Sequence, residues 1–597
     1  MARFSAKNLL KEARRRRVFR TIGLYIVGAW LVVQIALAVF PALSISETAI
    51  RYIWTAALLG FPLAVVFGWR YDIRGGRVER TASTRTDVSL SLGRGDFLLL
   101  GALGVIATAI LASSLWEIST TKPEQGASFV PTDVDINSVA VLPFLNMSSD
   151  PEQEYFSDGI TEEVLNLLVK IPELKVTSRT SVFSFKGQSI DIPTVAQKLG
   201  VAHILEGSVR RAGDRIRITA QLIEARNDVH LWSETYERQL DDIFAIQDEI
   251  AREVVEALHI QLLGDAPVAA STNTEAYNLY LRGKHFAAQR GREAWESSVK
   301  AYQGSIAFDA NFAAPWAGLS VVLRMQGQSG IADRQEAMEA SRRAAMRALE
   351  LDNELAEAWL SLAKIQFDYD WDWSSAEVTI RKALEYGPQD APVLRTATWI
   401  ALALGDAERA MGLAQLAVDL DPLDFSGLTN LAMAHWALGQ LEEEERTYWR
   451  ILELYPDAHS INSFLAAALA QQGRPEEGLQ YIDFESKGMW HRSMSIMVLH
   501  RLGRHEEEQP IRQKMVDDYS QTWPAGIAMT YAWHGDRDKA FEWLDIAFER
   551  RSLYMTNLLV NPWLVPLHID PRWEELLGRM ELQEYWEEMQ AGHEAKP

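Results

Sequence analysis

The chain of 597 residues contains no cysteine. It therefore forms no disulfide and has no cysteine-bound zinc, cysteine-bound iron–sulfur cluster or cysteine nucleophile. The patterns G-x-x-x-x-G-K-[ST], G-x-G-x-x-G, H-E-x-x-H and G-x-S-x-G are missing as well. Because nucleotide binding and hydrolysis often depend on these residue types at these spacings, the sequence predicts no catalytic residue and no cofactor. We expect a protein that is not an enzyme.

Histidine is scarce, with 12 residues scattered along the chain without the spacing of metal ligands. One stretch, HEEEQ from His505, begins like a zinc-protease motif but lacks the second histidine. We interpret it as an exposed face of a helix. The sequence therefore predicts no metal site.

Basic residues are few over most of the chain. Residues 1–116 hold 15 Lys and Arg against 6 Asp and Glu, whereas the remainder holds 44 against 75. An acidic body of this kind repels phosphates. The sequence therefore predicts that nucleic acid is not a partner.

Long apolar runs are confined to the first 116 residues, at about 22–40, 53–69 and 97–116. A helix of about 20 residues spans roughly 30 Å, which matches the apolar core of a bilayer. The runs predict three transmembrane helices within residues 22–116, after a basic cytoplasmic segment, 1–21. A soluble apolar core is an alternative that explains one such run better than three in series.

The flanks of these runs predict their orientation. Residues 1–20 hold eight Lys and Arg and residues 70–96 hold six arginines, whereas residues 41–52 hold only Arg51. The positive-inside rule then gives a cytoplasmic N-terminus and places everything after residue 116 on the far side. The predicted location is a bacterial inner membrane, with membrane lipid as a partner and the bulk of the chain in the periplasm.

Three small residues of the third run lie four apart on one helical face: Gly104, Thr108 and Ala112. Such a stripe predicts a contact with an integral membrane partner. The simpler alternative is that small residues are common in membrane helices.

After a polar segment with two prolines, 117–136, which we interpret as a linker, the pattern changes. Residues 137–263 contain short strand-like stretches, such as SVAVLPF and RIRITAQLIEA, between segments with a helical apolar period. The order of these stretches predicts a small α+β domain.

Residues 274–582 predict helix after helix with a repeat of 34 residues. Two residue types carry the repeat, and each recurs at intervals of 34: Gly405, Gly439 and Gly473, and Pro388, Pro422 and Pro456. Glycine between two helices and proline after the second are typical of tetratricopeptide repeats. We expect a superhelix with a terminal cap.

In such a superhelix the first helices of the pairs line the concave face. The repeat register places five side chains in that groove: Lys364, Arg395, Trp399, Met433 and Trp436. Trp and Arg are common in the energetically important centres of protein interfaces. The alternative is that several of these tryptophans belong to the core.

Five stretches follow one another within residues 138–262: VAVLPFLNMSSDPEQEYFSDGITEEV, VTSRTSVFSFKG, LGVAHILEGSVRRAGDRIRITAQLI, HLWSETYER and DIFAIQDEIA. On these stretches, residues 138–262 resemble the TolB amino-terminal-like (FlgO-type) domain of bacterial envelope proteins. In similar proteins this domain stands between a membrane segment and tetratricopeptide repeats, sometimes behind an adenylate cyclase or winged-helix domain. Residues 1–116 match neither of those, so the resemblance implies a member without that output domain.

Three carboxylates of the α+β segment, Asp158, Glu162 and Glu163, raise the alternative of acid–base chemistry. They stand near the start of a predicted helix, where negative charge complements the helix dipole. We interpret them as structural.

The fold class predicted from these features is a membrane-anchored multidomain chain of three transmembrane helices, a small α+β domain and an all-α tetratricopeptide-repeat superhelix. The predicted function is a non-enzymatic scaffold, anchored in the inner membrane, whose periplasmic repeats bind a protein or peptide. One alternative is an accessory sensor or transducer that acts through a partner membrane protein. A more remote one is an adenylate cyclase-related protein without a catalytic domain.

Overall fold

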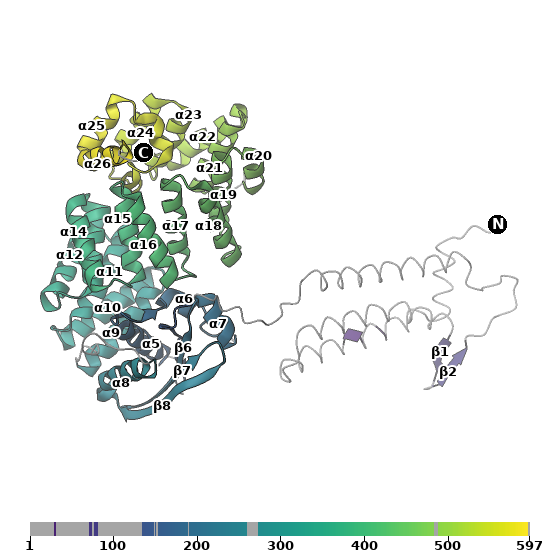
Figure 1. The fold of residues 1–597 in the computed structure, drawn as a ribbon, viewed down its shortest axis with the longest axis vertical. Helices are drawn as coiled ribbons and strands as arrows, with labels where there is room; N and C mark the ends of the chain where they lie inside the picture. The colour runs from purple at the N-terminus through teal and green to yellow at the C-terminus, as the bar shows by residue number, and fades with distance from the viewer. Residues whose placement is uncertain are drawn as a thin grey trace. The chain divides into compact units, whose positions relative to one another are not determined.

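The computed structural model describes residues 25, 29–30, 71–74, 77–80, 134–148, 150, 153–188, 190–258, 273–482 and 488–594. The chain divides into two compact units, Met1–Ala127 and Ser128–Pro597. Figure 1 shows the ribbon. In the first unit, strands β1 (Tyr71–Arg74) and β2 (Arg77–Arg80) pair as an antiparallel hairpin. This hairpin lies in segment 70–96, the arginine-rich flank between the second and third predicted spans.

The prediction of three transmembrane helices has to be corrected. Across the described ranges, no helix is both long enough and apolar enough to cross a bilayer. Some of these helices carry many charges, as α12 (Arg334–Leu351), RQEAMEASRRAAMRALEL, does. The more apolar ones are short, as α19 (His459–Gln471) is with 13 residues. The membrane-anchored fold class and the inner-membrane location are withdrawn on this finding. The predicted spans 22–40, 53–69 and 97–116, segment 1–21 and linker 117–136 lie almost wholly outside the described residues.

The second unit begins with a sheet of six strands in the order β5-β3-β6-β7-β8, in which β4 also pairs with β6. Strand β3 runs parallel to β5 and β6, whereas β6, β7 and β8 are antiparallel. The strands are β3 (Ser138–Val141), β4 (Leu145–Asn146), β5 (Lys175–Val176), β6 (His203–Ala212), β7 (Arg215–Glu224) and β8 (Val229–Gln239).

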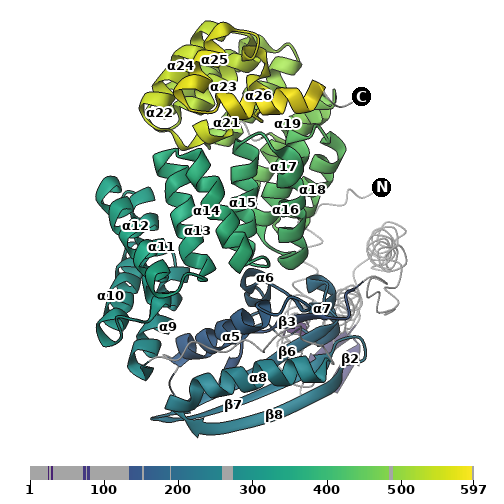
Figure 2. The ribbon, with the colours of Figure 1, turned by 60° about the vertical axis from the view of Figure 1, so that its left-hand side comes forward.

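One face of this sheet is buried. In β7, alternate residues Ile216, Ile218, Ala220 and Leu222 are buried, as the period of two along a strand requires. Helices α5 and α8 lie over the sheet (Figure 2). The helices of this region are α5 (Glu154–Val169), α6 (Arg179–Phe183), α7 (Ile192–Leu199), η3 (Leu240–Asp242) and α8 (Ile243–Ala257).

The strands and helices that the sequence predicted for this region are present. The turn at Gly213-Asp214 joins β6 to β7, and α7 ends at Gly200 as expected. Helix α6 was not predicted, because its five residues are too few to show a helical period.

From Thr274 onward the helices pack as antiparallel pairs. The pairs are α9 (Thr274–Ala288) with α10 (Arg292–Phe308), α11 (Ala313–Gln328) with α12, α13 (Ala356–Ile365) with α14 (Trp373–Tyr386), α15 (Ala391–Ala403) with α16 (Ala407–Leu420), α17 (Phe425–Ala437) with α18 (Leu441–Leu454), α19 (His459–Gln471) with α20 (Pro475–Gly478), α21 (Met489–Arg501) with α22 (His505–Tyr519), and α23 (Pro524–His534) with α24 (Arg537–Glu549).

The predicted 34-residue repeat is confirmed in the middle of this array. Gly405, Gly439 and Gly473 follow the first helices of three successive pairs, and their φ angles of 83°, 69° and 81° lie in the left-handed region. Glycine enters that region without the steric cost that a Cβ imposes. Pro388, Pro422 and Pro456 stand two residues after the second helices α14, α16 and α18.

Short elements interrupt or close the array: a π-helical turn η4 (Gln366–Asp370), 3-10 turns η5 (Leu479–Tyr481), η6 (Leu553–Asn557) and η7 (Pro562–Leu567), and helices α25 (Pro571–Arg579) and α26 (Gln583–Glu594). The C-terminal elements pack on the middle pairs. The Trp373 indole Nε1 donates to the Met580 carbonyl at 2.6 Å, and Arg551 Nη1 donates to the Tyr369 carbonyl at 3.0 Å.

The sheet region is bound to the repeats at α9, at Gln389 and at the connection after α16. At α9, the Lys284 ammonium lies 2.9 Å from Glu162 and 3.1 Å from Glu163 of α5. At the connection after α16, the Ser178 amide donates to the Leu420 carbonyl at 2.9 Å and the Ser181 amide to the Asp421 carboxylate at 2.9 Å. Helix α6 is therefore anchored to a helix pair about 240 residues farther along the chain.

Candidate functional site: a hollow between α21 and α23

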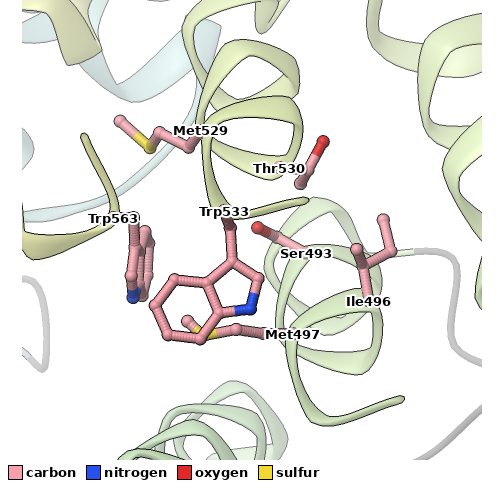
Figure 3. A pocket seen from close by; sticks show the side chains of 7 residues that line it. All are labelled: Ser493, Ile496, Met497, Met529, Thr530, Trp533 and Trp563. Atoms are coloured by element: carbon pink, nitrogen blue, oxygen red, sulfur yellow. The ribbon is translucent and has the colours of Figure 1, made fainter. Parts of the chain in front are cut away.

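A small hollow, with room for about one water molecule, opens between the first helices of two successive pairs. Its walls come from α21, α23 and η7, as Figure 3 shows. The lining residues are Ser493, Ile496, Met497, Met529, Thr530, Trp533 and Trp563. Small-molecule sites usually enclose about 300–1,000 Å³. This hollow is far smaller than such a site, so a partner's side chain enters it only if the lining side chains move apart.

The local sequence explains why the two helices expose apolar side chains to the hollow. Helix α21 has eight consecutive buried residues, Arg492–Leu499, because it packs against α19, α22 and α23. Helix α23 starts with Pro524 at its first position, which supplies no amide to the helix. It ends at Gly535, whose φ is 87°. Both helices are thus short, apolar on most sides and fixed at their ends.

Two tryptophans of the lining carry unused hydrogen-bond donors. The indole nitrogens of Trp533 and Trp563 are buried, and neither has a hydrogen-bond partner among the described residues. A buried polar group without a partner costs about 1–3 kcal/mol.

In the structure, the five residues predicted to line one groove lie in different surroundings. Lys364 lies 3.6 Å from Asp368, and Arg395 lies 2.8 Å from Asp424, so both cations are engaged in ion pairs within the chain. Burial lowers the pKa of Lys364, and Asp368 only partly opposes this effect.

The other three predicted groove residues pack toward the C-terminal segment. Trp436 is 8% exposed, and its ring meets that of Trp563 edge-on at a centroid distance of 5.2 Å. Trp399 is partly buried against the same core cluster, and Met433 packs in a small cluster with Val560. Trp436 therefore packs on Trp563, a residue of the wall, and does not itself line the hollow.

The predicted membrane contact, Gly104, Thr108 and Ala112, lies outside the described residues. The three carboxylates considered for acid–base chemistry face the repeats. Burial raises the pKa of Glu162, but Lys284 and Arg179 outweigh it, so that its pKa is lowered. Burial raises the pKa of Asp158, which pairs with Lys186. These groups hold α5 against α9 and α6.

The sequence analysis missed Met497, Met529, Trp533 and Trp563. Trp533 stands two residues before Gly535, near the end of a first helix, much as Trp436 stands three residues before Gly439. That similarity was a usable signal. Trp563 lies in η7, outside any repeat, and no periodicity could assign it to the hollow.

Comparison with known families matches residues 135–253 to the HilA/YgeH-like transcriptional regulator, second domain. A protein from Rhizobium meliloti named "Putative adenylate cyclase 3" is 43% identical over 189 residues, which are 31% of this chain and 32% of that protein. The chain thus spans about a third of the length of this relative. The TolB-like assignment of the sheet region stays a prediction.

Two solved structures illustrate the likeness of the repeats. YrrB, described as a TPR protein with an unusual peptide-binding site, shares 17% identity at a TM-score of 0.27 and covers 36% of this chain and 99% of its own. A tetratricopeptide repeat protein from Parabacteroides merdae shares 12% identity at a TM-score of 0.32 and covers 42% and 95%. The repeat architecture described above rests on the helix pairs, not on these overlaps.

Proposed function

We propose that this chain is a non-enzymatic scaffold that binds a protein or peptide segment at the hollow between α21 and α23. The observation that carries the proposal is the pair of unpartnered indole N–H groups, of Trp533 and Trp563, in a wall that also holds Met497 and Met529. A peptide carries apolar side chains, which can pack on this wall, beside main-chain carbonyl groups, which can accept hydrogen bonds from its indoles.

The chemistry of the lining supports this choice. Aromatic residues and Met are enriched in the buried centres of protein interfaces. Met is unbranched and polarizable, so it adapts to side chains of different shape.

The relative from Rhizobium meliloti does not lead us to propose cyclase activity. The matched part is 32% of that protein, and the name describes the whole of it. The alternative of an accessory sensor depended on membrane segments and is not developed further.

The test uses the purified full chain and a displayed library of random peptides of about ten residues. We expect selected peptides to share one large apolar residue. Trp533→Ala should weaken their binding at least about 30-fold, as loss of an interface hot spot of 2 kcal/mol or more does. Trp533→Phe keeps a ring but loses the N–H, and should cost about 2–10-fold.

The matched control is Trp449→Ala, because Trp449 is 41% exposed on α18 and does not line the hollow. It should leave peptide binding unchanged. Equal binding by wild type and Trp533→Ala, with helical content preserved in both, would reject the hollow as the binding site.

A further inference from the structure

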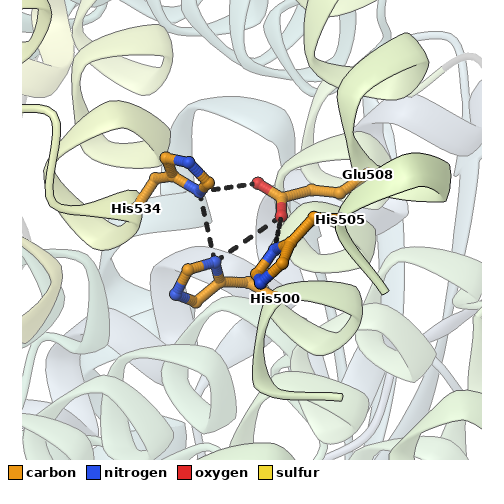
Figure 4. Close-up of side chains that lie close together, drawn as sticks. All are labelled: His500, His505, Glu508 and His534. Carbon is orange, nitrogen blue, oxygen red and sulfur yellow. Dashed lines mark hydrogen bonds and ion pairs between the residues drawn. The ribbon is translucent and has the colours of Figure 1, made fainter. Parts of the chain in front are cut away.

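Three histidines and one glutamate that are apart in sequence meet at the ends of three helices. His500 lies in the last turn of α21, His505 and Glu508 lie in the first turn of α22, and His534 is the last residue of α23 (Figure 4). One donor atom from each lies within 4.8 Å of those of the others.

The donor atoms that converge are the three Nδ1 nitrogens and the two carboxylate oxygens. His500 Nδ1 is 3.2 Å from His534 Nδ1 and 3.5 Å from Glu508 Oε2. His505 Nδ1 is 3.2 Å from Oε2, and His534 Nδ1 is 3.2 Å from Oε1. Ligands at about 2.0–2.1 Å from a tetrahedral Zn²⁺ are about 3.3 Å from one another. The closest donor pairs therefore already have the spacing of a tetrahedral shell.

The fold brings these residues together by two repeat features. His500 and His534 are 34 residues apart, so they lie near the ends of neighbouring first helices. Gly503, with φ of 69°, permits the tight turn after which α22 begins at His505. Residues three apart share a helical face, which places Glu508 beside His505.

One buried carboxylate, Glu508, faces the three rings of the cluster. The Glu508 side chain is fully buried, and Arg512 holds it at 2.9 Å. Arg512 thus orients the carboxylate as an outer-shell partner does.

The cluster is also accessible from solvent. The side chains of His500, His505 and His534 are 26%, 57% and 32% exposed. A metal ion can therefore reach the nitrogens without unfolding the helices, and the exposed ring of His505 can close over it.

We propose that His500, His505, Glu508 and His534 form a binding site for a divalent transition metal, of which Zn²⁺ is the best match. Imidazole and carboxylate ligands in tetrahedral geometry favour Zn²⁺. Four protein ligands leave no open position, which is typical of a structural site. Its role is to fasten α21, α22 and α23 to one another. This site is separate from the hollow and does not depend on the proposed function.

The test uses the full chain without a histidine tag, freed of metal with a chelator and titrated with Zn²⁺ in a calorimeter. We expect one Zn²⁺ per chain. His505→Gln and His534→Gln should each raise the dissociation constant for Zn²⁺ at least about 100-fold. Loss of an outer-shell partner alone already lowers metal affinity about 10–100-fold. Co²⁺ in place of Zn²⁺ should give the intense visible absorption of tetrahedral coordination.

The matched control is His435→Gln. His435 also lies in the last turn of a first helix, α17, but its Nδ1 contacts only Gln440 among the interactions described for it. It should bind Zn²⁺ as the wild type does. Absence of stoichiometric binding, equal binding by the His505 and His534 variants, or a weak octahedral Co²⁺ spectrum would overturn the proposal. The cluster would then be a hydrogen-bonded network only.

Discussion

The middle pairs α15–α20 and the later pairs α21–α24 share one architecture but differ in how regular they are. In the middle pairs, Gly405, Gly439 and Gly473 are spaced by 34 residues, whereas Gly503 and Gly535 of the later pairs are spaced by 32. The predicted groove side chains of the middle pairs are engaged, by ion pairs or by the C-terminal segment. The histidine cluster lies in the later pairs, and the hollow lies between α21, α23 and η7. Unpartnered indole nitrogens occur in both regions, at Trp436 and at Trp533, so the later pairs differ in bringing possible ligands together and not in holding unused donors.

The largest expected effect compares two tryptophans. Trp436→Ala removes a buried ring packed on Trp563, and we expect it to lower the free energy of unfolding by about 3–5 kcal/mol. Trp533→Ala, at the half-buried wall of the hollow, should cost clearly less. Urea unfolding followed by circular dichroism measures both. Equal losses would mean that the two regions are packed alike.

The next prediction concerns Glu444 of α18, which is 3% exposed. Burial raises its pKa from 4.5 to about 8. The folded chain therefore keeps a proton between about pH 4.5 and 8 that the unfolded chain releases, so stability should fall as the pH rises through this window. At pH 7 the free energy of unfolding should be lower by about 3 kcal/mol than it is below pH 4.5.

Glu444→Gln should therefore be more stable than the wild type at pH 7 and should lose most of this pH dependence. Urea midpoints at pH 5, 7 and 8.5 check the sign. A wild-type chain that gains stability from pH 5 to 8, relative to the variant, would contradict the buried neutral carboxyl.

A smaller effect tests the later pairs. Zn²⁺ at 100 times its dissociation constant should stabilise the folded chain by about 2.7 kcal/mol if it binds only the folded state. Thermal unfolding with and without Zn²⁺ measures the gain. His505→Gln should show none, and the same gain in that variant would place the effect elsewhere.

The smallest effect tests the regular repeat by two glycines. Gly439→Ala puts a Cβ at φ of 69° and should cost about 1–2 kcal/mol. Gly412 lies inside α16 with open space where a Cβ would stand, so Gly412→Ala should stabilise by about 0.5–1 kcal/mol. Opposite signs in urea unfolding are the expected result. Equal signs would show that the left-handed turn is not what selects glycine at position 439.

Much of the fold was predictable from local patterns. The alternation in β7 and the 34-residue spacing of Gly and Pro are properties of a few neighbouring residues, and the structure reproduces both. The transmembrane prediction was also local, since it relied on apolar runs alone. It is the prediction that the structure corrected, on the finding that no helix of the described residues could span a bilayer.

The candidate sites were much less predictable. Trp436 was singled out for the groove, but its partner Trp563 is 127 residues away in a segment without a repeat. The sequence analysis interpreted HEEEQ as an exposed helix face because it searched for ligands on one helix. In the structure, the other ligands come from α21 and α23.

The sequence by itself determined the helix pairs, the sheet strands and the absence of cysteine chemistry, because each depends on residue type and on spacing within one or two elements. Only the tertiary structure decided which side chains meet across elements. The hollow, the bond between α6 and Asp421 and the histidine cluster all join residues from separate elements. Their positions follow from how the helices pack, and packing depends on contacts that no single stretch of sequence contains.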